Sequence, residues 1–510
     1  MTNTIARWAR GGRMFWIVCL LAGLAVLLST GLSGHAFAQA ATEAATAAPA
    51  EAAAAAAAAP VAPPAIAVNK ADNTWMMISS VLVLLMTVPG LALFYGGLVR
   101  TKNMASVLTQ VLAIVCIVCV VWFIYGYSLA FTAGPSGFGK FVGGFSRVFL
   151  AGMPINSIVE TFSIGVGIHE LVFICFQMTF AAITTALVIG GFAERIKFGT
   201  VCLFAVLWST FVYFPIAHMV WFWPGPTGIA SDPSSASMAG LIWQYGALDF
   251  AGGTVVHVNA GIAALVGALM LGRRVGYGKE PMPPHSVTLT MVGAALLWVG
   301  WFGFNAGSNL EGNEYATLAL ANTFVATAAA GISWMFFEWI FKGKPSLLGL
   351  STGVVAGLVA VTPASGFAGP MGAILLGLIV SPVSLFFCSV AKNVFGYDDS
   401  LDVFGVHAIG GIIGAIGTGI LVSPDLGGAG IVDYTTCAAH AYLSCDGLAY
   451  NMTTQLMAQL KAVAIVVAWS GIGSFLIFTA LSLTFGLRVS EEAEREGLDI
   501  TEHGEQAYNY

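Results

Sequence analysis

Long apolar stretches dominate the chain, and short polar segments that carry most of its charged residues separate them. A helix needs about 20 apolar residues to cross the hydrocarbon core of a bilayer. Hydrocarbon satisfies no backbone hydrogen bond, so each such stretch is expected to be helical. The pattern predicts eleven membrane-spanning helices, at residues 75–98, 104–132, 166–192, 199–222, 250–272, 286–306, 316–341, 347–364, 370–391, 403–423 and 457–486.

Composition agrees with this pattern. Of the 510 residues, 58% are hydrophobic and only 9% are charged, whereas soluble domains carry about 25% charged residues. We therefore predict an all-α polytopic membrane protein. Its sequence contains no basic patch for nucleic acid, and no HExxH, P-loop or Gly-x-Ser-x-Gly motif. We expect no enzyme activity and no cofactor.

The N-terminal segment has the composition of a secretory signal. Arg7, Arg10 and Arg13 precede an apolar run, and Ala36-Phe37-Ala38 provides a small-residue cleavage pattern. Residues 1–38 are interpreted as a signal peptide, although an uncleaved first span is the alternative. The Ala/Pro-rich residues 39–70 are interpreted as a flexible periplasmic tether before the membrane domain at residues 71–486.

The positions of lysine and arginine predict the orientation. Twelve of the sixteen that follow the signal peptide lie after odd-numbered spans or in the C-terminal tail. Cytoplasmic loops carry the excess of these residues, which places the N-terminus in the periplasm and the C-terminus in the cytoplasm. The charged tail, residues 487–510, is either solvated or a contact surface for partner proteins or neighbouring subunits.

Two polar stretches inside predicted spans five and ten resemble each other. "VHVNAGIAALVG" begins at Val256, and "VHAIGGIIGAIG" begins at Val406. Five spans followed by five similar spans must run in opposite directions, which indicates an inverted repeat with a site near the membrane midplane. His257 and His407 are then expected to meet near the centre, where ionisable residues usually line a pathway.

The acids that precede these histidines leave a second chemistry open. Asp249 and Asp402 lie near the predicted helix starts, where an aspartate is more often a cap than a ligand. Two histidines with either acid would suit zinc with an open coordination position, but no metal-ligand spacing is present. We therefore expect no metal site.

Aromatic and cysteine residues mark the predicted outer side. Aromatic side chains near span ends are usually part of an interfacial belt, but their faces also attract cations by about 0.5–2 kcal/mol. Cys437 and Cys445 lie in a polar loop outside the membrane. An oxidising compartment makes a disulfide between them plausible.

Several ordered motifs resemble the ammonium transporter (Amt/Mep/Rh) family, in its bacterial Amt branch. They include "PGLALFYGGLVRTKN", "FAERIKF", "PIAHMVW", "LDFAGGTVVHVNA", "GWFGFNAGS" and "DVFGVH", and the resemblance extends from about Lys70 to Tyr508. It implies a protomer of eleven helices, with a five-plus-five inverted repeat and a C-terminal helix. It also implies a homotrimer with one pore per protomer, located in the bacterial inner membrane.

The resemblance implies roles for matching positions, listed here: Phe176, Trp221 and Ser308 in an outer ammonium site, Phe180 and Phe304 in a gate, His257 and His407 in the pore, and Asp249 as a structural acid. It assigns no role to His169 and Glu170. Ammonium would lose a proton outside, and ammonia would cross with or without a coupled proton. Methylammonium would serve as an analogue, and a PII signal-transduction protein would dock on the cytoplasmic tail. An ammonium sensor with the same fold is the alternative.

Overall fold

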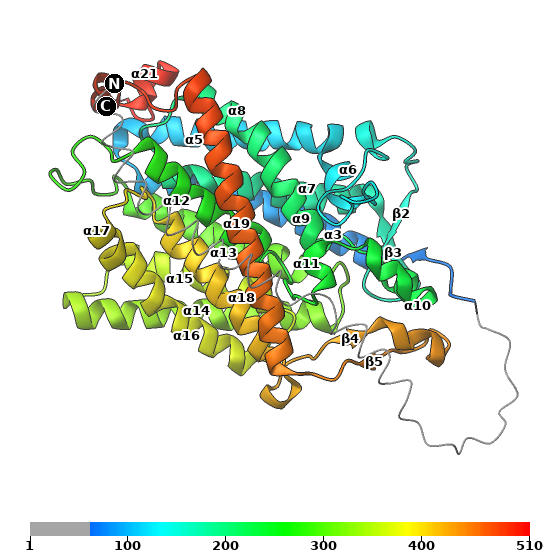
Figure 1. Cartoon of the computed structure of the whole chain (residues 1–510). Coiled ribbons are helices and arrows are strands. Elements are labelled where there is room, and N and C mark those ends of the chain that lie inside the picture. The colour runs from blue at the N-terminus through cyan, green and yellow to red at the C-terminus, as the bar shows by residue number, and fades with distance from the viewer. Residues whose placement is uncertain (1–61, 510) are drawn as a thin grey trace, which may run out of the picture.

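The computed structural model describes residues 62–509 (Figure 1). The predicted signal peptide and most of the predicted tether lie outside these residues. Within the described part of the chain, eleven helical segments are long and apolar enough to cross a membrane, which confirms the predicted number. They are Lys70–Leu98, Thr101–Phe131, Glu170–Gly191, Phe198–Trp221, Gly253–Leu271, Val287–Gly307, Glu314–Lys342, Leu347–Ala364, Pro370–Phe395, Phe404–Leu421 and Met452–Thr484.

The α-helices of these spans are, in order, α3 (Lys70–Leu85), α4 (Ala92–Leu98), α5 (Met104–Val121), α6 (Tyr127–Phe131), α7 (Glu170–Val188), α8 (Phe198–Trp208), α9 (Phe214–Trp221), α12 (Asn259–Leu271), α13 (Val287–Gly307), α14 (Glu314–Lys342), α15 (Leu347–Val361), α16 (Pro370–Phe386), α17 (Lys392–Phe395), α18 (Ile409–Leu421) and α19 (Met452–Thr484). Figure 1 shows α19 running diagonally across the bundle, with the C-terminal α21 (Leu498–His503) at one end and a small β-hairpin at the other.

The third span is shorter than predicted. Residues 166–169, expected to be helical, instead form strand β3 (Val166–His169). This strand pairs in parallel with β1 (Ala67–Val68) and antiparallel with β2 (Ile158–Glu160). Apolar composition alone does not distinguish a short central strand from the first turn of a buried helix, and α7 begins only at Glu170.

Several spans contain a π-helical turn, which is one residue wider than an α-turn. Such turns occur at Met86–Leu91, Trp122–Gly126, Ser209–Tyr213, Gly253–Val258, Phe387–Ala391 and Phe404–Ala408. Spans four and nine form one pair in this set, and spans five and ten form another. These are the pairs that the inverted repeat relates. His257 and His407 both lie in these wider turns.

Glycines hold spans five and ten together in a reciprocal contact. A β-carbon at Gly261 would lie 2.4 Å from the backbone nitrogen of Ala408, and one at Gly411 would lie 3.0 Å from a methyl group of Val258. Each glycine therefore packs against the residue that follows the histidine of the other span. Any larger side chain would force the two helices apart, and the two histidines with them.

The loops on the side that the sequence predicts to be outer, called the outer loops below, contain short elements of their own. These are α10 (Pro226–Ser231), α11 (Leu241–Gln244) and a hairpin of β4 (Val432–Asp433) and β5 (Asp446–Gly447). A disulfide joins Cys437 to Cys445 within this hairpin. The pairing considered from the sequence is thus present in the structure, and it closes the loop that lies over the outer face.

The C-terminal tail is packed against the other end of the bundle. The backbone N–H of Ser106 donates to Asp499 over 2.8 Å, and that of Phe198 donates to Glu502 over 2.8 Å. Arg488 binds Glu494 in α20 (Glu491–Glu496), and Glu494 also accepts from the backbone N–H of Val275. These contacts join the tail to the chain's own loops, and a contact surface for partner proteins or neighbouring subunits stays a prediction.

Candidate functional site

Two stacked phenylalanines divide the centre of the molecule. The rings of Phe180 on α7 and Phe304 on α13 are 4.1 Å apart between centroids and inclined by 12°. Both are almost completely buried. Phe180 lines the cavity on the outer side, whereas Phe304 does not. The pair therefore forms the floor of that cavity and separates it from the histidines below.

A cavity of about 1260 Å³ lies on the outer side of this pair. Trp221, Ser308 and Asp249, which the resemblance assigns to an outer ammonium site and a nearby structural acid, line it. Phe176 does not: it is fully buried, and it packs against Phe180 with a centroid distance of 4.9 Å. The structure thus places Phe176 behind the gate ring, while Phe180 itself faces the cavity.

Hydrogen bonds orient the groups that face the cavity. The indole Nε1 of Trp221 donates to the backbone oxygen of Asp249 over 3.0 Å. Its ring meets that of Phe180 edge-on at 5.8 Å. The hydroxyl of Ser308 donates to the backbone oxygen of Phe304 over 2.8 Å, which leaves its oxygen lone pairs available to a donor in the cavity.

The carboxylate of Asp249 caps the helical segment that carries His257. Oδ1 accepts from the backbone N–H groups of Gly252 and Gly253 at 2.8 and 2.6 Å, and Oδ2 accepts from those of Thr254 and Val255 at 2.8 and 3.2 Å. The hydroxyl of Thr254 donates to Oδ2 as well. The acid thus satisfies the free N–H groups at a buried helix start.

The expectation that Asp402 caps the start of span ten is wrong. Asp402 forms an ion pair with Lys392 at 2.8 Å and has a left-handed φ of 60°. The residue that accepts from the start of span ten is Asp399, whose Oδ2 binds the backbone N–H of Phe404 over 2.8 Å. Asp399 lies 150 residues after Asp249, the same separation that relates His257 to His407.

The two histidines meet below the phenylalanine pair. Their Nδ1 atoms are 3.2 Å apart, which is hydrogen-bonding distance, and both side chains are buried. Two neutral imidazoles can form this bond only if one donates and the other accepts. The Nε2 atom of His257 has no hydrogen-bond partner within the described chain. It is therefore available to a small molecule in the pore.

Sequence reasoning missed Trp301, which lies beside the histidine pair. Its ring stacks on that of His257 at 5.3 Å and 21°, and its Nε1 donates to Thr362 over 2.9 Å. It occupies the same face of α13 as Phe304, three residues earlier, and this spacing within "GWFGFNAGS" was the available signal. Gln177 was also missed. It lines the outer cavity, and its Oε1 has no partner in residues 62–509.

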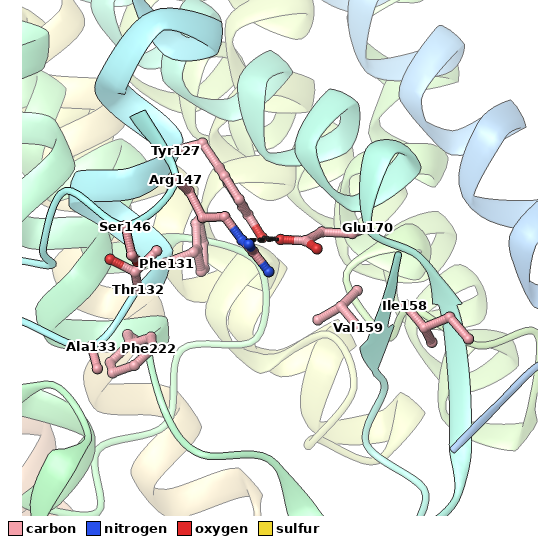
Figure 2. Close-up of a pocket in the computed structure, with 10 residues that line it drawn as sticks. All are labelled: Tyr127, Phe131, Thr132, Ala133, Ser146, Arg147, Ile158, Val159, Glu170 and Phe222. Atoms are coloured by element: carbon pink, nitrogen blue, oxygen red, sulfur yellow. Dashed lines mark hydrogen bonds and ion pairs between the residues drawn. The ribbon is translucent and has the colours of Figure 1, made fainter. Parts of the chain in front are cut away.

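Glu170 is held by an ion pair and hydrogen bonds at the start of α7. Figure 2 shows it facing Tyr127 and Arg147 across a smaller cavity of about 450 Å³. The Tyr127 hydroxyl donates to Oε1 over 2.8 Å, Arg147 pairs with the same atom at 3.3 Å, and the Ser157 hydroxyl donates to Oε2. These partners fix the start of α7, which carries Phe180 ten residues further along the helix.

The geometry of the described residues gives no support to the zinc alternative. Within residues 62–509, no three His, Cys, Asp or Glu side chains are grouped closely enough to hold a metal ion. Both oxygens of Asp249 already accept hydrogen bonds from N–H groups, as described above. The histidines stand with aromatic rings around them and have no acidic ligand beside them.

Comparisons with known proteins agree on one family. The family model described as "Ammonium Transporter Family" matches residues 74–508. An ammonium transporter of Aquifex aeolicus is 44% identical over 443 residues, covering 87% of this chain and 94% of its own. The crystal structure of Saccharomyces cerevisiae Mep2 superposes with a TM-score of 0.70 at 30% identity, covering 83% of this chain and 91% of Mep2. A structure titled "Sensor Amt Protein" gives a TM-score of 0.71 at 26% identity, covering 85% and 98% of the two chains.

Proposed function

The chain belongs to the ammonium transporter family, and we propose that it recruits ammonium in the outer cavity, removes one proton and conducts ammonia past His257 and His407. One observation carries this proposal: the cavity, the phenylalanine pair and the histidine pair follow one another in space. The His257 ring centroid lies 6.0 Å from that of Phe304, which itself stacks on the ring lining the cavity.

The outer cavity suits a small cation. Trp221 and Phe180 offer aromatic faces, which attract cations by about 0.5–2 kcal/mol, and the Ser308 oxygen offers an acceptor for an N–H group. Ammonium satisfies both kinds of contact. Potassium has the charge but no proton to donate or to lose.

The pore below suits a neutral molecule. A charged species leaving water for a dry, aromatic passage incurs a desolvation cost of several kcal/mol. Ammonia avoids most of that cost, and the free Nε2 of His257 gives it one hydrogen-bonding partner on the way. The proton either stays outside or follows along the bonded Nδ1 pair, which would make transport electrogenic.

The experiment measures ammonium-evoked current and methylammonium uptake in proteoliposomes that contain wild type or His257→Ala. We expect the variant to lose current or to lose selectivity against potassium, because the bonded histidine pair is broken. Current that is undiminished and equally selective would contradict the role of the pair. A matched control is His440→Ala, since His440 lies in the exposed outer hairpin and binds only Asp446.

Assembly and partners follow from the same family membership. We propose a homotrimer in a bacterial inner membrane, oriented with the tail in the cytoplasm, and a PII protein as the partner of the tail face. The support is the packed position of α20 and α21 at the end opposite the outer hairpin (Figure 1). Native mass spectrometry and co-purification from nitrogen-shocked cells test these points, and a stable monomer or the absence of PII would contradict them.

A sensor role is the second candidate, because one similar structure is titled a sensor Amt protein. A sensor would bind ammonium without appreciable flux. Uptake of labelled methylammonium into proteoliposomes separates the two, since a sensor predicts binding with no uptake above empty vesicles.

A further inference from the structure

The outer cavity extends well beyond the residues at its inner end. Trp221, Phe180 and Ser308 occupy only its inner end, and the rest is enclosed by outer loops, among them the disulfide-closed hairpin. Four aromatic side chains gather in that outer part, and we name them the outer aromatic subsite: Phe162, Trp223, Trp243 and Tyr434.

The subsite is centred on Trp223. Its ring lies 5.7 Å from that of Trp243, 5.2 Å from that of Tyr434 and 6.1 Å from that of Phe162. The Trp223 ring is near-parallel to the rings of Trp243 and Phe162, at 21° and 18°, and is tilted by 41° to that of Tyr434. All four side chains line the same cavity.

Three separate chain segments hold these rings in place. Tyr434 lies at the base of the hairpin closed by Cys437 and Cys445, and its hydroxyl donates to the backbone oxygen of Phe162 over 3.1 Å. Trp243 belongs to α11, and Trp223 follows α9. The disulfide limits the movement of the hairpin, so the ring of Tyr434 stays near that of Trp223.

The charges around the cavity have one sign. Glu160, Asp249, Glu314 and Asp433 line it, and no Lys, Arg or His is among the described residues that do so. Asp249 is engaged as a helix cap. Glu160 accepts from Thr227 and Gly165 close to the subsite. A cavity lined by charges of one sign concentrates ions of the other sign.

We propose that the outer aromatic subsite binds a second ammonium-type cation, ammonium or methylammonium, before it reaches Trp221 and Phe180. The proposal rests on the transport function proposed above and adds a separate recruitment step. Aromatic faces and nearby carboxylates favour a small cation that carries N–H groups. The carboxylates that line the cavity would raise the local cation concentration, and the subsite would hold a cation before it moves to the inner end.

The test measures concentration-dependent methylammonium uptake by the full chain in proteoliposomes. The first variant is Trp223→Leu combined with Trp243→Leu, and the second is Tyr434→Leu, which alters the hairpin only. We expect KM to rise about three- to tenfold in the first and less in the second. Vmax should be unchanged, because proton removal takes place deeper. Trp223→Phe, which keeps an aromatic face, should restore most of the affinity.

The matched control is Trp339→Leu, which removes an exposed tryptophan of α14 far from the cavity. Its KM should equal that of wild type. If KM stays within about twofold of wild type in both test variants, the subsite does not exist, even though transport itself is sound. If wild type shows no uptake, the transport function has failed instead, so the two failures are distinguishable.

Discussion

Asp249 and Asp399 occupy equivalent places at opposite ends of the pore, yet their surroundings differ. Asp249 accepts from four backbone N–H groups and one hydroxyl. Asp399 is more deeply buried, yet its Oδ1 has no hydrogen-bond partner in the described chain, and its Oδ2 accepts from Phe404. The two halves of the repeat therefore share the position of the capping aspartate, but not the number of hydrogen bonds that it accepts.

The missing hydrogen bonds affect the protonation of Asp399. A buried carboxylate with an unpartnered oxygen is held in the fold at a cost. Burial raises the pKa of Asp399, Lys392 opposes the rise and Asp402 adds to it, which leaves the value at about 7. Asp399 can therefore change its protonation state near neutral pH.

The largest expected effect comes from Asp249→Ala. It leaves the N–H groups of Gly252, Gly253 and Thr254 without acceptors in a buried place, at a cost of about 3 kcal/mol or more. We expect the apparent melting temperature in detergent to fall by several degrees and methylammonium uptake to be lost. Asp249→Asn, which keeps one acceptor oxygen, should lose less. A melting temperature like that of wild type for Asp249→Ala would remove the basis of the comparison.

Asp399→Ala should cost less. Only the N–H of Phe404 loses a side-chain acceptor at hydrogen-bonding distance, so we expect a loss of about 1 kcal/mol. Thermal unfolding of both alanine variants in the same detergent makes the comparison. Equal destabilisation by Asp249→Ala and Asp399→Ala would show that the two caps are energetically equivalent after all.

The third prediction concerns pH and uses Asp399→Asn, which keeps the acceptor for Phe404 but cannot titrate. A folded-state pKa above the unfolded value of about 4 means that the folded form holds the proton more tightly. The contribution of Asp399 to stability is therefore present below pH 4 and is lost as the pH rises through about 7.

The measurement is the melting temperature of wild type minus that of Asp399→Asn between pH 5 and pH 8. This difference should fall steadily as the pH rises, because each pKa unit corresponds to about 1.4 kcal/mol. Taking the difference cancels the carboxylates common to both proteins. A flat difference over this range would show that Asp399 does not titrate there.

The smallest effect is expected from Asp402→Asn. The negative charge of Asp402 raises the pKa of Asp399, so its removal should lower that pKa by less than about one unit. The curve to compare is the melting temperature of Asp402→Asn minus that of the double variant Asp402→Asn with Asp399→Asn, and its midpoint should move to lower pH. Glu491→Gln, on the tail and outside the cluster, serves as the matched control and should leave the midpoint in place. A shift to higher pH would contradict the arrangement of charges described here.

The sequence predicts the spans and the histidine pair well, because hydropathy and a repeated motif are local signals. The motif repeated 150 residues apart was sufficient to predict that His257 and His407 meet. The same separation also relates Asp249 to Asp399, but proximity along the chain pointed to Asp402 instead. Asp402 instead has a positive φ and forms an ion pair with Lys392, and neither feature leaves a trace in hydropathy.

Other features depended on contacts between distant segments. Strand β3 pairs with the neighbouring β2 and with β1, which lies about a hundred residues earlier in the chain. Phe176 was placed in the outer site, but which of two rings one helical turn apart faces a cavity depends on how α7 is rotated in the bundle. Trp301 escaped notice for the same reason, since aromatic residues are common throughout these spans.

The π-helical turns around the histidines also determine the direction in which the imidazoles point from the helix axis. An α-helix advances by about 100° per residue, and a π-turn accommodates one additional residue within a single turn. The residue thus inserted rotates everything beyond it by about that angle relative to everything before it. The imidazole of His257 therefore lies on a face that a regular helix beginning at Gly253 would not give it, and deleting Val255 would turn the imidazole away from His407 while leaving both side chains intact.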